Sequence, residues 1–329
     1  MKKYAIICLE RKIKMLKIIL SIIISFVTVV VIMPFLIPFL RKLKFGQQIL
    51  EIGPNWHKNK QGTPTMGGIA FIIGIIIAYI FVIRDLRALL VLLFAFICGV
   101  VGFTDDFIKV YYKRNMGFNA KQKTLCLIAA MIVFILAARL LGYINTEIYI
   151  PFIKVNVDLS VWYYPLIVFV LFGGINSINL TDGIDGLAGS VTAVVSVFFA
   201  VTSFILGYHG LSYLSAAVLG GLVGFLVFNL NPAKVFMGDT GSLFLGGMIT
   251  GMAVITKNPF ILLVVGFVYV AESLSVILQV ASFKLTGKRI FKMSPIHHHF
   301  EMCGWRENKI VIVFSALTAV LCIIGYLGV

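Results

Sequence analysis

The chain contains ten apolar runs that are nearly free of charged residues and long enough to cross a lipid bilayer. A membrane-spanning α-helix needs about 20 such residues. The runs lie at about 18–40, 67–83, 88–104, 124–142, 160–175, 187–206, 211–229, 241–256, 259–283 and 309–328. Only 12% of the residues are charged, whereas soluble proteins carry about a quarter. We therefore expect an all-α polytopic integral membrane protein of about ten transmembrane helices, forming a single domain over residues 1–329.

Lysine and arginine are distributed unevenly between the two sets of alternate loops. The loops at 41–66, 105–123, 176–186, 230–240 and 284–308 carry 16 of these residues, and the loops of opposite parity carry four, leaving aside the N-terminal segment. Loops rich in lysine and arginine stay in the cytoplasm. The first set is therefore predicted to be cytoplasmic, with both termini outside. The net charge of +15 follows from the same rule, and the alternative is that some of these cations face phosphates.

Two segments depart from the pattern of simple spans and loops. Residues 143–160 alternate polar and β-branched residues, which predicts a short extracytoplasmic β-hairpin, with an irregular loop as the alternative. The ninth run contains Glu272 and Gln279, so we expect it to be bent or only partly lipid-facing. The first 14 residues are basic although the topology places them outside. Because Met15 begins a more ordinary membrane-protein start, we interpret residues 1–14 as an N-terminal extension.

The stretch 173–189, GGINSINLTDGIDGLAG, is dense in polar side chains although apolar runs flank it on both sides. Carboxylates and amides are costly next to hydrocarbon and usually serve a function there. The stretch therefore predicts a polar site at the bilayer surface. Its four candidate residues are Asn176, Asn179, Asp182 and Asp185.

Three further acids lie in motif-like contexts on the same predicted face. Asp105 and Asp106 end the third run, and Asp239 lies in GDTGS before the eighth. Adjacent carboxylates repel each other unless a cation or a proton intervenes, and hard oxygen ligands select Mg²⁺ or Mn²⁺. We interpret them as a metal or proton-transfer site, with Lys109 facing a phosphate. The alternatives are a helix flank for the pair and an ordinary turn for Asp239.

Two other motifs suggest recognition of anions. GTPTMGG at 62–68 opens the second run, where the N–H groups of a helix N-terminus can bind an anion, and an ordinary helix-entry turn is the alternative. SPIHHHFE at 294–301 has three consecutive histidines, which cannot all face one metal from a regular helix. We expect a hydrogen-bonding patch for a phosphate or sugar. The nearby basic residues at 284–292 would attract anionic lipid headgroups, or reflect topology alone.

Acids, amides, basic residues and glycine-rich turns on one face together indicate metal-assisted phosphoryl chemistry on a membrane-embedded substrate. The motifs GTPTMGG, DDFIK, NSINLTDGIDGLAG, NPAKVFMGDTGSL and SPIHHHFE, in this order, resemble those of the phospho-N-acetylmuramoyl-pentapeptide transferase family (MraY). That family belongs to the polyprenyl-phosphate N-acetylhexosamine 1-phosphate transferase superfamily. The resemblance covers residues 15–329 and leaves only the first 14 outside.

The resemblance implies an enzyme of peptidoglycan synthesis in the bacterial cytoplasmic membrane. It would transfer phospho-MurNAc-pentapeptide from UDP-MurNAc-pentapeptide to undecaprenyl phosphate, giving lipid I and UMP. It further implies ten transmembrane helices, both termini outside, an active site on the cytoplasmic face, a Mg²⁺ cofactor and a homodimer. No nucleic-acid partner is expected.

The resemblance also assigns roles residue by residue. The metal-binding aspartate falls on Asp239. Catalytic residues are implied at Asp105, Asp106, Asp239 and His298. Substrate-binding residues are implied at Lys60, Thr65, Asn176, Asn179, Asp182, Asp185, Asn229, Gln279 and His299.

Two mechanisms and two other functions remain as alternatives. In a single displacement, Asp105 helps the lipid phosphate attack the β-phosphorus of the UDP-sugar, whereas in a double displacement Asp239 or Asp106 first forms a phospho-enzyme. We favour direct attack, because a terminal phosphate is already largely anionic near neutral pH. The other functions are a GlcNAc-1-phosphate transferase and a non-catalytic lipid transporter or binding protein. The form PIHHHFE argues against the former, and acids gathered at span ends on one face argue against the latter.

Overall fold

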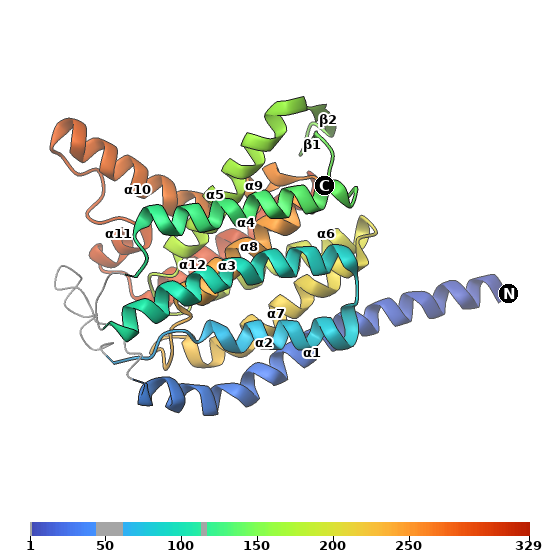
Figure 1. Cartoon of the computed structure of the whole chain (residues 1–329), viewed down its shortest axis with the longest axis horizontal. Helices are drawn as coiled ribbons and strands as arrows, with labels where there is room; N and C mark the ends of the chain where they lie inside the picture. The colour runs from blue at the N-terminus through green and yellow to red at the C-terminus, as the bar shows by residue number, and fades with distance from the viewer. Residues whose placement is uncertain (1, 44–61, 113–116) are drawn as a thin grey trace.

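A computed structural model describes residues 2–43, 62–112 and 117–329, with side chains from residue 9 onward. The described part of the chain is mostly helical, with one small β-hairpin (Figure 1). In order, the elements are α1 (Lys2–Lys42), α2 (Gly68–Ala78), η2 (Tyr79–Ile83), α3 (Leu86–Tyr111), α4 (Ala120–Leu140), β1 (Glu147–Ile150), β2 (Val155–Asp158), η3 (Ser160–Trp162), α5 (Tyr163–Thr181), α6 (Leu187–Ile205), α7 (His209–Asn229), α8 (Gly238–Ile255), η4 (Pro259–Ile261), α9 (Leu262–Val265), α10 (Phe267–Thr286), α11 (Ile296–Met302) and α12 (Glu307–Tyr326).

Eight helices in these described ranges are long and apolar enough to cross a membrane: α1, α3, α4, α5, α6, α7, α10 and α12. The two other predicted spans also form helices. Helix α2 and its π-helical continuation η2 make a shorter apolar segment, Gly68–Ile83. Helix α8 has 18 residues and begins with the polar sequence GDTGS. The prediction of an all-α polytopic membrane protein is confirmed.

The ninth predicted span is bent. Helix α9 ends at Val265, α10 begins at Phe267, and Gly266 between them has φ −99° and ψ 15°. Within α10, Glu272, Ser275 and Gln279 are buried. A helix keeps residues spaced by three, four and seven on one face, so α10 turns a single polar face toward the protein.

The predicted hairpin is also confirmed. Strands β1 and β2 pair antiparallel, with Glu147 opposite Asp158 and Ile150 opposite Val155. The N–H of Tyr149 donates to the carbonyl of Lys257 at 3.0 Å, which ties the hairpin to the turn after α8. Both chain termini lie at this end of the bundle, and α11 lies at the other (Figure 1).

Helix α8 forms the centre of the bundle. It packs against α3, α5 and α2, and every residue from Thr240 to Ile255 is buried. Glycine allows the backbones to approach closely: a Cβ at Gly102 of α3 would overlap the carbonyl of Asp239, and one at Gly68 of α2 would overlap Gly241. The end of α3 and the start of α8 therefore meet without intervening side chains.

Helix α1 is longer than predicted. The sequence predicts a span at 18–40, whereas the helix has 41 residues and begins at Lys2. Its N-terminal part extends beyond the bundle (Figure 1). The interpretation of residues 1–14 as an extension stays a prediction.

Candidate active site

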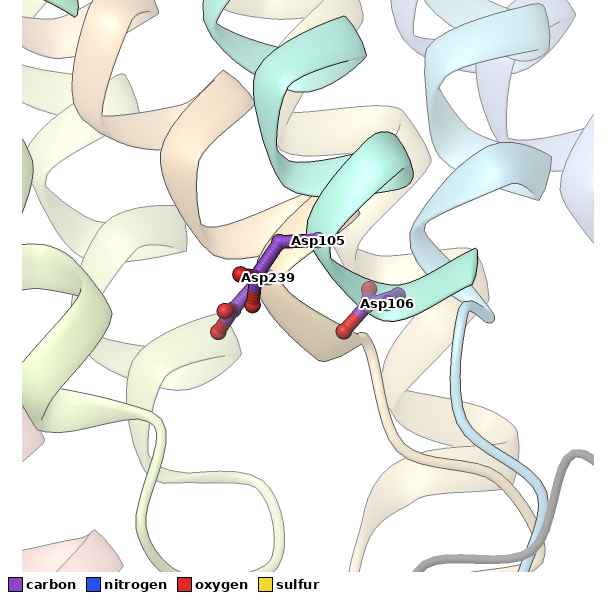
Figure 2. A group of neighbouring side chains, drawn as sticks. All are labelled: Asp105, Asp106 and Asp239. Carbon is purple, nitrogen blue, oxygen red and sulfur yellow. The ribbon is translucent and has the colours of Figure 1, made fainter. Parts of the chain in front are cut away.

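Three aspartates from two helices form a compact cluster, in which Asp105 and Asp106 are buried and Asp239 is partly exposed. Asp105 and Asp106 lie in the last turns of α3, and Asp239 lies in the first turn of α8 (Figure 2). One carboxylate oxygen from each lies within 4.8 Å of the others. Asp105 and Asp106 are only 3% and 4% exposed. The three acids that the sequence singled out in two separate motifs are thus brought together.

Asp106 caps helix α8 from outside that helix. Its Oδ2 accepts hydrogen bonds from the backbone N–H of Thr240 at 2.9 Å and from the Thr240 hydroxyl at 2.8 Å. The first N–H groups of a helix have no intrahelical partner and favour a negative charge. In this structure the carboxylate of Asp106 takes the position that an anion could occupy at this helix start.

Asp239 receives positive charge from two helices. Its Oδ2 lies 3.0 Å from Lys109 Nζ of α3 and 2.9 Å from Lys123 Nζ of α4. Its other oxygen, Oδ1, accepts from Asn179 Nδ2 of α5 at 2.9 Å. The Asn179 amide also donates to Ser242 Oγ at 2.7 Å. Four helices therefore converge on one carboxylate.

Asp105 is held by the segment that enters α4. Its Oδ1 accepts from the backbone N–H of Phe118 at 2.7 Å, and its Oδ2 lies 2.6 Å from Lys109 Nζ. Helix α4 begins in a capping box formed by Asn119 and Gln122, which fixes the first turn. Lys123, the next residue, is thereby aimed at the acids.

Asp182 belongs to the same electrostatic environment. Burial, together with the negative charges of Asp239, Asp106 and Asp185, raises the pKa of Asp182 well above its ordinary value of 3.8. Carboxylates packed together without enough positive charge each disfavour ionisation of the others. A cation arriving at the cluster would relieve this repulsion.

The donor set fits a divalent cation. All three clustered ligands are carboxylate oxygens, the type that Mg²⁺ and Mn²⁺ prefer, and their separation within 4.8 Å suits metal–oxygen bonds of about 2.0–2.6 Å. Lys109 and Lys123 already partly neutralise Asp239. A bound cation would therefore compete with these ammonium groups for the same oxygen.

Comparison with known proteins agrees with this geometry. Residues 88–257 match the family model for glycosyl transferase family 4, and residues 60–72 match the phospho-N-acetylmuramoyl-pentapeptide-transferase signature 1. The chain is 48% identical over 289 residues to the phospho-N-acetylmuramoyl-pentapeptide-transferase of Thermoanaerobacter sp. (strain X514), covering 88% of this chain and 91% of the relative. It is 47% identical over 316 residues to that of Clostridium kluyveri (strain ATCC 8527), covering 95% and 100%. This chain belongs to the phospho-N-acetylmuramoyl-pentapeptide-transferase family.

The family's signature segment lies beside the acids. The carbonyl oxygen of Pro64 accepts a hydrogen bond from the N–H of Phe236 at 2.8 Å. This bond joins the signature segment to the loop before α8. A Cβ at Gly238 would lie 2.7 Å from Thr65 Oγ1 and 2.5 Å from Asp106 Oδ2, so Thr65 borders the cluster. Lys60, also expected at the site, lies outside the described residues.

The anion site expected at the start of α2 is not available in the form predicted. The N–H groups of Gly67 and Gly68 donate to the carbonyls of Phe236 and Met237 at 2.8 and 3.1 Å. These groups therefore bind the protein's own backbone. These bonds favour the alternative interpretation, an ordinary helix-entry turn, and here that turn packs against the loop before α8.

Asp185 and Asn229, both predicted to bind substrate, connect the α5–α6 loop to the α7–α8 loop. Asp185 Oδ2 accepts from Asn231 Nδ2 and from the N–H of Ala233, both at 3.0 Å. Asn229 accepts from Gly186 N–H at 3.1 Å and donates to the carbonyl of Val235 at 2.8 Å. Both residues fix the α5–α6 loop against the α7–α8 loop. Any contact with substrate would be additional to these bonds.

Two other residues predicted to bind substrate, Asn176 and Gln279, make their hydrogen bonds elsewhere in the bundle. Asn176 donates to the carbonyl of Phe172 in its own helix at 2.8 Å. Gln279 accepts from the N–H groups of Ile290 and Phe291 at 3.0 and 2.9 Å and donates to the carbonyl of Phe291 at 2.9 Å. The amide of Asn176 is therefore bonded within α5, and that of Gln279 is bonded to the segment after α10, rather than to the acid cluster.

The histidine motif forms the short helix α11. His298 Nδ1 lies 2.6 Å from Glu301 Oε2, and His299 Nδ1 accepts from the N–H of Lys292 at 3.1 Å. The structure thus holds both predicted histidines within the last polar segment.

Lys123 and Thr240 contact the acids, and neither was predicted from the sequence as a site residue. Lys123 was counted only as a topology signal, although the pattern Asn119-x-x-Gln122 marks a helix start and places Lys123 one turn inside it. Thr240 looked like a turn residue in GDTGS. Nothing in the sequence indicates that its partner is Asp106.

Proposed function

We propose that this chain transfers phospho-MurNAc-pentapeptide from UDP-MurNAc-pentapeptide to undecaprenyl phosphate, forming lipid I and UMP for peptidoglycan synthesis. Its relatives bear the name of this transferase, and the chain matches them over nearly their whole length. The structural observation that carries the proposal is the cluster of the buried Asp105 and Asp106 with the partly exposed Asp239, joined to two lysines. Acids and cations that converge in a protected site suit phosphoryl transfer, where catalysis is mainly positioning and charge stabilisation.

We propose distinct roles for the three acids. Asp239 would hold Mg²⁺, or Mn²⁺ in its place, because it lies at the meeting point of four helices. Asp106 would fix α8, since it caps the Thr240 N–H. Asp105 would orient or deprotonate the acceptor phosphate. When bound, the divalent cation would neutralise charge on the pyrophosphate, and Lys109 and Lys123 would add positive charge beside it.

The contacts of Asp239 favour a single displacement. This carboxylate accepts from two ammonium groups and an amide, and such stabilisation lowers its nucleophilicity. In the proposed step, a phosphate oxygen of the lipid bonds to the β-phosphorus of the UDP-sugar. The bond from that phosphorus to the bridging oxygen breaks, and UMP leaves with the electron pair.

We further propose that the acid cluster faces the cytoplasm. The lysine and arginine distribution supports this orientation, and the hairpin and both termini would then lie outside. The homodimer implied by the resemblance stays a prediction, which the mass of the detergent-solubilised protein would test.

The test measures UMP release by the purified protein in detergent, with donor and undecaprenyl phosphate. Release is expected to require both the lipid and Mg²⁺, and Asp239→Asn should reduce kcat on the order of 1,000-fold without lowering the thermal midpoint. Release that needs no lipid acceptor would instead favour a phospho-enzyme or hydrolysis. Turnover of UDP-GlcNAc but not of the MurNAc donor would assign the sister activity.

A further inference from the structure

A glutamate is fully buried within the membrane-spanning helix α10. Glu272 is 0% exposed, and its Oε2 lies 3.0 Å from Nδ1 of His297, which is also 0% exposed. The backbone N–H of His297 donates to the same oxygen at 3.4 Å. An ionisable residue inside a membrane helix is costly and usually has a specific partner and task. Here the partner is the first histidine of the HHH motif.

The opposite edge of His297 supports the polar α5–α6 loop. A Cβ added to Gly183 would overlap His297 Nε2, so glycine is required where the imidazole approaches the backbone. Gly183 directly follows Asp182. The ring of His297 also lies 4.2 Å from that of His298. His297 therefore lies between the carboxylate of α10, the loop that carries Asp182, and the next histidine.

Helix α10 holds the chain leading into α11 at a second point. Gln279 binds the backbone at Ile290 and Phe291 through three hydrogen bonds. Glu272 and Gln279 are seven residues apart and so share one helix face. The two anchors leave His297 little freedom to move away from Gly183.

We infer that Glu272 and His297 are positioning residues for donor binding: Glu272 orients His297, and His297 sets the position of Gly183 and thereby of Asp182. This inference rests on the proposed function and on the prediction, implied by the family resemblance, that Asp182 binds substrate. Among the described residues, the side chain of Glu272 contacts His297 rather than the acids or the loop. Its effect passes entirely through the imidazole.

The test compares variants at three positions by donor affinity and by kinetics. In Gly183→Ala the new methyl group displaces the loop, and the Kd and KM for UDP-MurNAc-pentapeptide should rise about 10-fold. The KM for undecaprenyl phosphate should stay the same. Glu272→Ala should act in the same direction, whereas Glu272→Gln, which retains an acceptor oxygen, should restore most of the affinity. A loss of folded protein alone would lower kcat and leave both KM values unchanged.

The double variant Gly183→Ala/His297→Ala isolates the contact. Removing the imidazole leaves room for the methyl group, so the double variant should bind donor no more weakly than His297→Ala alone. A further 10-fold loss in the double variant would overturn the inference, as would unchanged donor affinity in Glu272→Ala. Gly173→Ala is the matched control, because an added Cβ there meets no atom within 4 Å, and thermal midpoints verify folding of each variant.

These outcomes are separate from failure of the proposed function. If the wild-type protein binds and turns over the donor but the variants bind it normally, the positioning role is wrong and the transferase stands. If the wild-type protein neither binds nor turns over the donor, the proposed function itself is wrong.

Discussion

The acid cluster and the histidine segment are both polar, but they are built in different ways. The acids lie where α3 meets the central helix α8, and lysines from two helices hold Asp239. The histidine segment is held by α10, through one buried carboxylate and one amide. In the acid cluster, lysines pair with carboxylates where the backbones of α3 and α8 are in contact. In the histidine segment, the side chain of His297 packs against the α5–α6 loop. The former should therefore govern the chemical step and the latter the placement of substrate.

Among changes that leave the three aspartates in place, the largest expected effect comes from separating α3 from α8. In Gly102→Ala the methyl group overlaps the Asp239 carbonyl, which should move Asp105 away from Asp239 and lower kcat about 100-fold. Steady-state kinetics with both substrates would measure this. Donor affinity should change little, and a rise in donor KM with normal kcat would contradict the division between the two regions.

Removing one counter-charge should have a smaller effect. Lys123→Gln loses the 2.9 Å pair with Asp239, and we expect kcat/KM to fall about 10-fold. Lys121→Gln, two residues earlier on the exposed side of α4, is the matched control and should behave as wild type. Equal losses in the two variants would mean that general surface charge, rather than the contact with Asp239, is responsible.

Changes in the histidine segment should be weaker still and of another kind. Gln279→Leu removes three hydrogen bonds to Ile290 and Phe291, which should raise donor KM about threefold and speed trypsin cleavage after Lys288 and Arg289. Gln279→Glu keeps the acceptor oxygen and should protect this segment better. If cleavage is unchanged in Gln279→Leu, the amide does not hold the segment.

The smallest effect concerns stability and pH. Because the pKa of Asp182 is raised in the folded protein, the folded state binds more protons than the unfolded state above pH 3.8, and stability falls as pH rises from there toward the folded pKa. Asp182→Asn removes this penalty. Without divalent cations, its thermal midpoint should exceed that of wild type by roughly 2–4 °C at pH 8, and by less at pH 5.

Asp158→Asn provides a control of opposite sign. Hydrogen bonds from Thr146 and Ser160 lower the pKa of Asp158, so its carboxylate stabilises the fold above pH 3.8 and this contribution is lost as the pH falls. The Asn variant should therefore be no more stable than wild type at pH 8. A higher midpoint in both variants would show that charge removal in general, rather than the crowding at Asp182, is stabilising.

The sequence was sufficient to predict most of the fold. Apolar length predicted each span, and the alternation at 143–160 predicted the hairpin, because hydrocarbon and strand geometry each impose a simple pattern. The length of α1 could not be predicted, since a helix can continue through polar residues beyond the bilayer. The site acids were also predictable, because a carboxylate close to the hydrocarbon is costly and usually has a function there.

Pairings across the bundle could not be predicted. Asp106 and Thr240 are 134 residues apart, and no local pattern encodes their contact. The same is true of the Gly67 and Gly68 N–H groups, which look available in sequence but bind the carbonyls of the loop before α8. A sequence shows which N–H groups lack a partner within a helix, but the acceptor that each one binds depends on the tertiary structure.

The burial of α8 has a consequence for how the chain enters the membrane. Its first turn is polar and contains Asp239, and every residue from Thr240 to Ile255 is covered by protein. An isolated segment of this kind partitions poorly into lipid during biosynthesis, because an aspartate is costly within the hydrocarbon. Neighbouring helices such as α3 and α5 must therefore retain α8 in the bilayer. The metal-binding residue proposed here would reach its place only as the bundle assembles, so an incompletely inserted chain would lack the reactive site altogether.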